Sequence, residues 1–206
     1  MTHQPIRFYL DFVSTYSYFA AHRIEKICAE YDRLVDWRIV SLPHIFKATG
    51  TVSPLAQPLK LAHNHQDILR LVGITGLPFI RPPVVAPDVQ WARLVFYKLR
   101  AINPTEANQF AFNALNLRFG HGRELNTLDT LVQAALGLSI TAKDIEATRE
   151  DFGAKAALVA MADTAIVDGM FGAPFVRADE EKFWGHDRTT DHLQWWLSRK
   201  DHSSKN

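Results

Sequence analysis

The feature that most restricts the fold of this chain is a change of hydrophobic period at Ser14. In residues 6–13 apolar side chains alternate with a period of two, which indicates a half-buried strand. Beyond Ser14, apolar residues recur on one helical face as far as Tyr31, and serine is a favoured N-cap. We therefore expect a strand, 6–13, that runs directly into a helix, 15–31. The Ser14 hydroxyl would lie beside the unpaired N–H groups of the first helical turn, where an anion can be held.

The rest of the chain predicts a second strand and then mostly helices. Apolar and charged side chains alternate again in residues 35–40, and a strand–helix–strand unit of this kind has parallel strands. The middle segment, 43–150, shows only helical patterns, at 58–72 (stopped by Gly73), 88–101, 103–120 (with Asn103 as N-cap), 128–136 and after Thr141, and a stiff loop at 76–83. The last part predicts a helix at 154–167, a hairpin of 175–176 with 182–184, and a helix at 187–197.

Composition excludes several classes of protein. Lys and Arg total 23 against 22 for Asp and Glu, so the chain has no positive field that would attract nucleic acid. No apolar run reaches the length of a membrane span and the N-terminus lacks a signal-peptide pattern, so we expect a cytoplasmic protein.

The single cysteine, Cys28, excludes dithiol chemistry within one chain, and we expect it to be packed in the core. His63 and His65 point to different sides of a helix, and no metal site is expected.

Three motifs connect the chain to a known family. Ser14-Thr15-Tyr16-Ser17 resembles the thioredoxin-like redox motif with both cysteines replaced by serine. Together with FKATG at 46–50 and GMFGAPF…FWGHDR at 169–188, the stretch DFVSTYSYFA resembles the kappa-class glutathione transferases and the 2-hydroxychromene-2-carboxylate isomerases. The motifs stand in the family's order over nearly the whole chain. The expected α/β fold is a thioredoxin-like domain made of 1–42 and 151–206, with an inserted all-helical domain at 43–150.

The resemblance implies glutathione as cofactor and a set of residues that hold it. Ser14, the catalytic residue, would face the sulfur with its hydroxyl. The bond between Ala173 and Pro174 would be cis, and the Ala173 backbone would pair with the cysteinyl part of glutathione. The γ-glutamyl end would lie against the segment that ends in Asp187, which would meet its amino group; this segment is Trp184, Gly185, His186 and Asp187. Many family members carry Gln, Asn or Ser where His186 stands.

Four further residues are assigned by the same resemblance. Lys47, in FKATG, would hold a substrate carboxylate as a point charge. Gln57 and Lys60 lie in the stretch that lines the substrate and glutathione entrance in relatives, and Tyr16 would either shield the sulfur or cover the core. An Asn commonly follows FKATG in the family, whereas this chain has Thr51.

Free energies show why the Ser14 hydroxyl matters for a bound thiolate. A thiol with pKa about 8.5 needs a shift of about two units, near 2.7 kcal/mol, to be mostly ionised at neutral pH. A helix N-terminus supplies about 0.3–1 kcal/mol and at most about 2 kcal/mol. A hydrogen bond to a charged group adds roughly 1.5–3 kcal/mol. The helix dipole alone falls short, and the dipole together with Ser14 is sufficient.

The resemblance implies a glutathione-dependent isomerase that acts on a small aromatic acid through reversible thiolate addition, without consuming glutathione. A kappa-type transferase that conjugates glutathione to electrophiles is the alternative enzyme. The alternative from another class is a thioredoxin-like binding module without catalysis, in which the serines are only helix caps. A homodimer is also left open, since relatives are often dimers.

Overall fold

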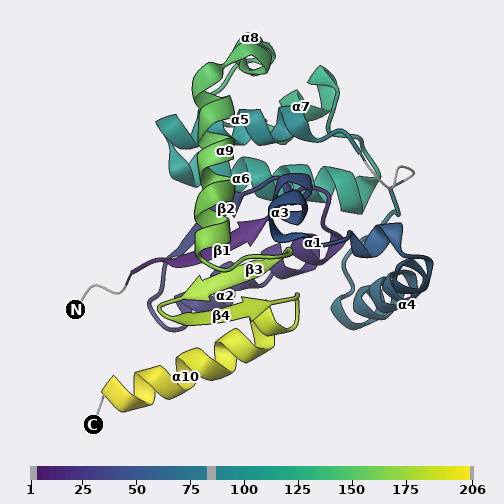
Figure 1. Cartoon of the computed structure of the whole chain (residues 1–206). Helices are drawn as coiled ribbons and strands as arrows, with labels where there is room; N and C mark the ends of the chain where they lie inside the picture. The colour runs from purple at the N-terminus through teal and green to yellow at the C-terminus, as the bar shows by residue number, and fades with distance from the viewer. Residues whose placement is uncertain (1–3, 83–86, 205–206) are drawn as a thin grey trace.

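The computed structural model describes residues 4–82 and 87–204, and its centre is a four-stranded sheet in the order β2-β1-β3-β4 (Figure 1). The strands are β1 (Ile6–Leu10), β2 (Val35–Ile39), β3 (Phe175–Ala178) and β4 (Glu181–Trp184). β1 pairs with β2 in parallel and with β3 antiparallel, and β3 pairs with β4 antiparallel across a tight turn at Asp179 and Glu180. The predicted βαβ unit and the C-terminal hairpin are both confirmed.

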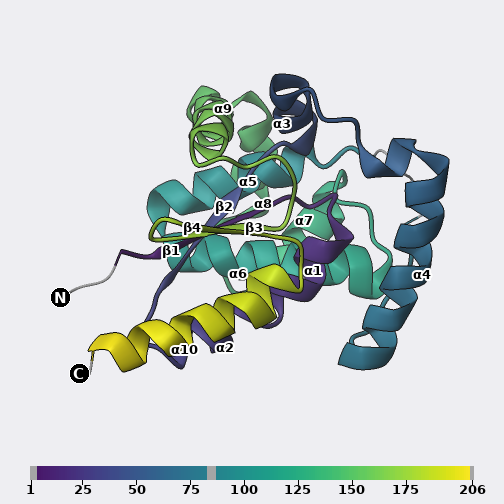
Figure 2. The ribbon, with the colours of Figure 1, turned by 60° about the horizontal axis from the view of Figure 1, so that its bottom comes forward.

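Helices cover both faces of this sheet. They are α1 (Thr15–Ala21), α2 (Ile24–Ala29), α3 (Leu42–Thr49), α4 (Pro58–Thr75), α5 (Gln90–Ile102), α6 (Pro104–Leu115), α7 (Leu128–Ala134), α8 (Ala142–Ala147), α9 (Phe152–Val167) and α10 (Leu193–Ser204). Single turns of 3-10 helix lie at η1 (Pro54–Ala56) and η3 (Thr148–Glu150), and π-helical turns at η2 (Asn116–Gly120) and η4 (Arg188–His192). Figure 2 shows α3 and α9 above the sheet and α1, α2 and α10 below it.

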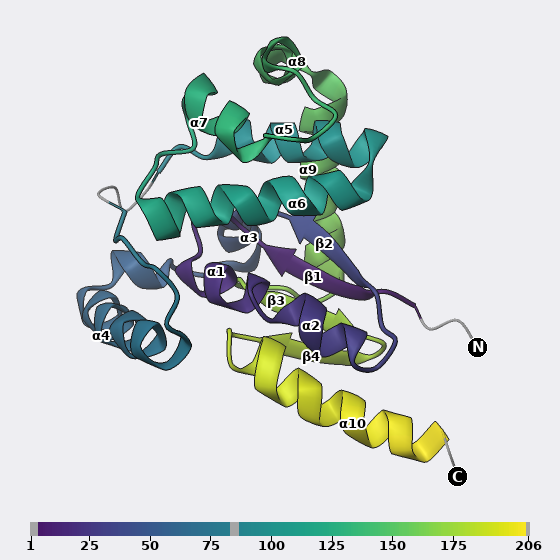
Figure 3. The same cartoon turned by 180° about the vertical axis from the view of Figure 1, so that it is seen from behind.

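Side chains along β1 point alternately to the two faces of the sheet, and this divides the core into two clusters. Phe8 and Leu10 point to the larger cluster with α1, α2, α5 and α6, whereas Tyr9 points to the smaller cluster with α3 and α9. Phe12 and Phe110 meet edge to face in the larger cluster, so α6 shares one core with the start of the chain. Figure 3 shows α5 and α6 side by side, with α6 next to α1. The division into a thioredoxin-like and a helical domain stays a prediction.

The first strand and helix are shorter than expected. β1 ends at Leu10 because the Asp11 carboxylate turns inward to accept a hydrogen bond from the Leu42 N–H, while the Asp11 carbonyl accepts one from the Ser14 N–H. The expected helix 15–31 is divided into α1 and α2 at Arg23, whose φ of −123° is not helical. The Arg23 guanidinium binds Asp191 at 2.5 Å, which ties the break between α1 and α2 to the C-terminal segment.

Other boundaries also differ from the prediction. α4 passes through Gly73 and ends at Gly76, whose φ of +67° is a left-handed C-cap that favours glycine. The expected irregular loop follows at 76–82, and Pro83 lies outside the described residues. Asn103 is an N-cap as predicted, and its side chain accepts from the N–H groups of Thr105 and Glu106.

The lone cysteine is packed as predicted. Cys28 is a free thiol with no exposed surface, and burial raises its pKa to about 12. Among the described helices, none combines the length and apolar character needed to cross a membrane.

Candidate active site

The site is built around Ser14, which caps α1 as predicted. Its backbone is extended (φ −92°, ψ 108°), and its Oγ accepts a hydrogen bond from the Ser17 N–H at 3.1 Å. The same Oγ donates to the carbonyl oxygen of Ala173 at 3.0 Å. The peptide bond between Ala173 and Pro174 is cis, as the resemblance implied. Ser14 is 8% exposed, and its hydroxyl faces the segment that leads into β3.

A buried ion pair, which sequence reasoning missed, holds the turn before Ser14 in place. Asp11 and Arg93 form a two-point contact, Nε to Oδ1 at 3.0 Å and Nη2 to Oδ2 at 2.7 Å, and the exposed fractions of the two residues are 0% and 5%. Because the Asp11 carbonyl also accepts from the Ser14 N–H at 2.9 Å, the pair positions the cap residue. The only local signal for it was the one acidic residue within the expected strand 6–13.

Tyr16 connects α1 with α4 and with the segment after β4. Its hydroxyl donates to Asp67 at 2.8 Å, and its ring stacks on His186 with centroids 6.1 Å apart. Burial, together with the bond to Asp67, holds the pKa of Tyr16 well above its usual 10.0. Burial lowers the pKa of His186, against the opposing charge of Asp187. Tyr16 is half-buried against the larger core cluster, which favours the covering role among the two alternatives; the shielding role stays a prediction.

The segment from Trp184 to Asp187 lies next to this stack. The Trp184 ring packs on Phe171 with centroids 4.7 Å apart, and its indole nitrogen approaches Gly172 so closely that a Cβ there would lie 2.6 Å away. Gly185 has a φ of +101°, a backbone conformation that favours glycine, and its N–H donates to the carbonyl of Pro174. The hairpin thus connects the segment to the residue after Ala173.

Asp187 stands at the start of the C-terminal helical segment, as predicted, but its side chain makes no cap hydrogen bond. Its carboxylate is half-exposed. It forms an ion pair with the Arg188 guanidinium, at a distance of 3.3 Å. A carboxylate at this place is available to a cationic group of a ligand.

A pocket of about 170 Å³ is lined on one side by Val13 and Thr15, the two chain neighbours of Ser14, though not by Ser14 itself. Its other walls come from η1, α4, the loop that follows α4, and η2, and they include Leu61, Phe79 and Arg118. None of these three was singled out from the sequence, because nothing local distinguishes an apolar or basic residue that lines a pocket from one that lies elsewhere.

None of the predicted site residues lines this pocket, and the three polar ones outside the Ser14 region lie as follows. Lys47 is exposed on the last turn of α3, and Lys60 is exposed on the first turn of α4. Gln57 precedes α4, and its side-chain amide donates to the Val52 carbonyl at 3.3 Å. Leu55 and Leu61, which lie close to Gln57 and Lys60 in the chain, do line the pocket. The roles of the three polar residues stay predictions.

The chain is similar to known proteins both in sequence and in structure. Two proteins named 2-hydroxychromene-2-carboxylate isomerase are similar in sequence. The one from Pseudomonas sp. (strain C18) is 28% identical over 191 residues, which cover 89% of this chain and 85% of the relative. The one from Pseudomonas putida is 26% identical over 187 residues, which cover 89% of each chain. The solved structure of a 2-hydroxychromene-2-carboxylate isomerase superposes with a TM-score of 0.88 at 22% identity, over 98% of both chains. The model of the DSBA-like thioredoxin domain matches residues 5–194, and the chain belongs to that family.

Proposed function

We propose that this chain is a glutathione-dependent isomerase of aromatic acids of the 2-hydroxychromene-2-carboxylate kind. The observation that carries the proposal is the contact between the Ser14 hydroxyl and the Ala173 carbonyl, beside a pocket about as large as one aromatic ring. An engineered cavity of about 150 Å³ is known to hold benzene. The names of the relatives supply the reaction class.

The residues present fit the tripeptide. The Ala173 carbonyl can accept a hydrogen bond from a ligand backbone N–H, and the Ser14 hydroxyl can donate one to a sulfur. The Asp187 carboxylate, which makes no cap hydrogen bond, can accept from an ammonium group. When bound, glutathione supplies a thiolate that adds reversibly to a conjugated substrate, so that a substrate bond can rotate before the thiol leaves.

The chain's own contribution begins with the single proton of Ser14. That proton is directed at the Ala173 carbonyl in this structure. The Ala173 carbonyl can also accept from a ligand N–H, and the Ser14 hydroxyl can turn its proton from this carbonyl to the sulfur and hold the sulfur as an anion. The oxygen of Ser14 keeps its bond from the Ser17 N–H throughout, so the cap and the catalytic role are compatible.

Pocket shape supplies the remaining contribution of the protein. The pocket keeps a planar substrate beside Ser14 and reduces the entropy cost of bringing it to the sulfur. The proposed roles of Lys47 at the substrate carboxylate, and of Gln57 and Lys60 at the entrance, follow the resemblance and are tested separately.

The deciding experiment is an isomerisation assay with 2-hydroxychromene-2-carboxylate. The assay is run with and without added glutathione, and the total amount of glutathione is measured during the reaction. We expect interconversion with the open-chain isomer, dependence on added glutathione, and a constant amount of glutathione. Steady loss of glutathione with a chlorinated aromatic, and no isomerisation, would favour the transferase. If calorimetry shows no glutathione binding, only the non-catalytic binding module remains.

A further inference from the structure

The pocket beside Ser14 contains an arginine whose hydrogen-bonding capacity is mostly unused. Arg118 lies in the π-helical turn η2, is 2% exposed, and lines the pocket. Its one hydrogen bond within the described part of the chain runs from Nη1 to Glu124 Oε2 at 3.0 Å. The Arg118 Nε and the Glu124 Oε1 are both buried and have no partner there. π-Helical turns occur frequently at functional sites.

A second buried arginine of the same chain shows what a purely structural pair looks like. Arg93 binds both oxygens of Asp11 through Nε and Nη2, the two-point geometry in which a guanidinium and a carboxylate satisfy each other. Arg118 makes a one-point contact instead. Since burying a charge without enough partners is costly, such an arrangement persists where another group completes it. Arg33 also has an unpartnered Nε, but its Nη2 makes two bonds and it does not line this pocket.

The rest of the lining indicates what kind of group that is. No acidic side chain lines the pocket within the described residues, whereas Arg81 lines it together with Arg118. Phe79 and Phe119 stack with an interplanar angle of 11°, and the Arg118 guanidinium lies over the Phe119 ring. The pocket therefore combines a flat aromatic wall with excess positive charge, which suits a planar aromatic ring that carries a carboxylate.

We propose that Arg118 binds the anionic oxygen of the substrate inside this pocket and contributes to the selection of acids over neutral analogues, in addition to the contact that the resemblance assigns to Lys47. The inference deepens the proposed function, and its connection to catalysis rests on that function. Arg118 contacts the substrate directly through its unused N–H donors, and its pair with Glu124 holds the guanidinium in position. A lysine would be a poorer replacement, since it presents a point charge rather than a planar fork.

The test is a binding titration by calorimetry without glutathione, with trans-cinnamate and its methyl ester as probes. For the unchanged protein we expect the acid to bind at least tenfold more tightly than the ester. Arg118→Gln should raise the Kd of the acid about tenfold, which corresponds to about 1.4 kcal/mol, and leave the Kd of the ester within about twofold. Arg118→Lys should give an intermediate value.

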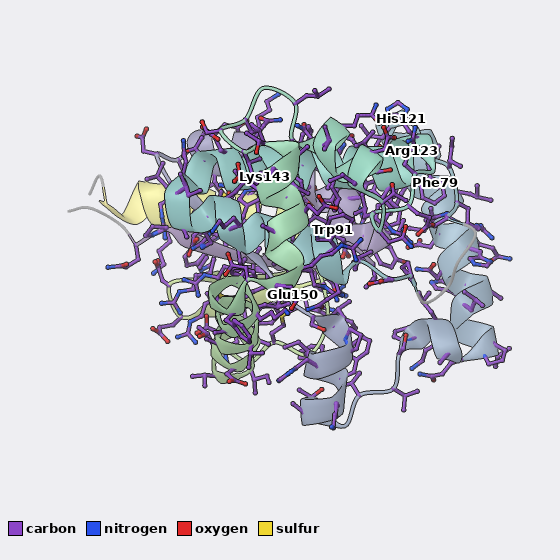
Figure 4. All side chains as sticks on the ribbon, turned by 90° about the horizontal axis from the view of Figure 1, so that it is seen from above. Phe79, Trp91, His121, Arg123, Lys143 and Glu150 are labelled. Carbon is purple, nitrogen blue, oxygen red and sulfur yellow. The ribbon has the colours of Figure 1, made fainter. Side chains whose placement is uncertain are left out.

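Two further variants separate binding from folding. Arg123→Gln removes a neighbouring surface charge that pairs with Asp129, and it should leave both Kd values unchanged; Figure 4 labels Arg123 and Phe79 on the same side of the molecule. Glu124→Gln removes the counter-charge of Arg118, so it should tighten acid binding at least about twofold without affecting the ester. This variant decides the question if Arg118→Gln does not fold.

The inference is overturned if the unchanged protein binds neither probe or binds both equally, if a folded Arg118→Gln keeps the preference for the acid, or if Glu124→Gln weakens acid binding. Because glutathione is absent from the titration, the result is independent of the isomerase assay. Arg118-dependent acid binding without isomerisation would leave this inference standing and remove the proposed function. Isomerisation with no preference for the acid would do the opposite.

Discussion

The hydroxyl of Ser14 donates a hydrogen bond to the carbonyl oxygen of Ala173 at 3.0 Å, although 159 residues separate the two in the chain. A serine hydroxyl carries one proton, so this proton can serve the carbonyl or a bound sulfur, but not both at once. The contact couples the helix cap to the segment that precedes β3. In the proposed function, the Ser14 proton turns from the Ala173 carbonyl to the bound sulfur.

Replacement of Ser14 tests this coupling. Ser14→Ala should cost about 1 kcal/mol of folding free energy through the lost cap, and the protein should still fold. The thiolate absorbance of bound glutathione should disappear, because the hydrogen bond that holds the sulfur ionised is lost. Ser17→Ala is the matched control, since the Ser17 hydroxyl is buried without a partner and its loss should leave the absorbance unchanged. Equal absorbance in Ser14→Ala and the unchanged protein would refute the role of Ser14.

Replacement of Lys47 tests the contact proposed between this exposed lysine and the substrate carboxylate. Lys47→Met should raise the KM for the acid about fivefold with little change in kcat, because an exposed point charge contributes on the order of 1 kcal/mol. The KM for a neutral ester should not change. Lys60→Met is the companion variant and should weaken glutathione binding instead. A KM for the acid that is indifferent to Lys47→Met would remove this residue from the site.

The buried pair of Asp11 and Arg93 predicts a large loss of stability. Asp11→Asn leaves the Arg93 charge uncompensated in the core, which typically costs about 3–5 kcal/mol. Urea unfolding should show this as a lower midpoint with an unchanged slope. The exposed pair of Arg123 and Asp129 is the comparison, and Arg123→Gln should shift the midpoint little. Similar shifts for both variants would show that Asp11 does not hold the turn before Ser14.

The stability should also depend on pH through His22. Burial lowers the pKa of His22 from its ordinary 6.5, although the bond to Asn116 acts in the opposite direction. The folded state therefore favours the neutral ring. The contribution of neutral His22 to the free energy of unfolding is complete above pH 6.5, and it is lost as the pH falls through the lowered folded-state pKa. The free energy of unfolding should decrease on acidification below pH 6.5, and less steeply in His22→Gln. His186, whose pKa is also lowered, contributes in the same direction, so part of the slope should remain. Identical slopes in the two proteins would contradict the assignment to His22.

The local parts of the site could be predicted from the sequence. The change of period at Ser14 predicted a strand, a cap and a helix, and all three are present. The motif around Ala173 predicted the cis bond through its resemblance to known proteins. α4 was expected to stop at Gly73 but stops at Gly76. Both glycines fit a helix end, and the left-handed cap conformation is found at the second.

By itself, the sequence determined all four strands of the described sheet and most of the helices, although not α3 or the break between α1 and α2. Hydrophobic period and helix caps depend on residues within a few positions of one another, so they can be read locally. Only the tertiary structure decided that Asp11 meets Arg93, that Ser14 meets Ala173, and that Arg118 lines the pocket beside them. These contacts depend on how helices rotate and pack against the sheet. That rotation is set by the whole core at once, so no short stretch of sequence records it.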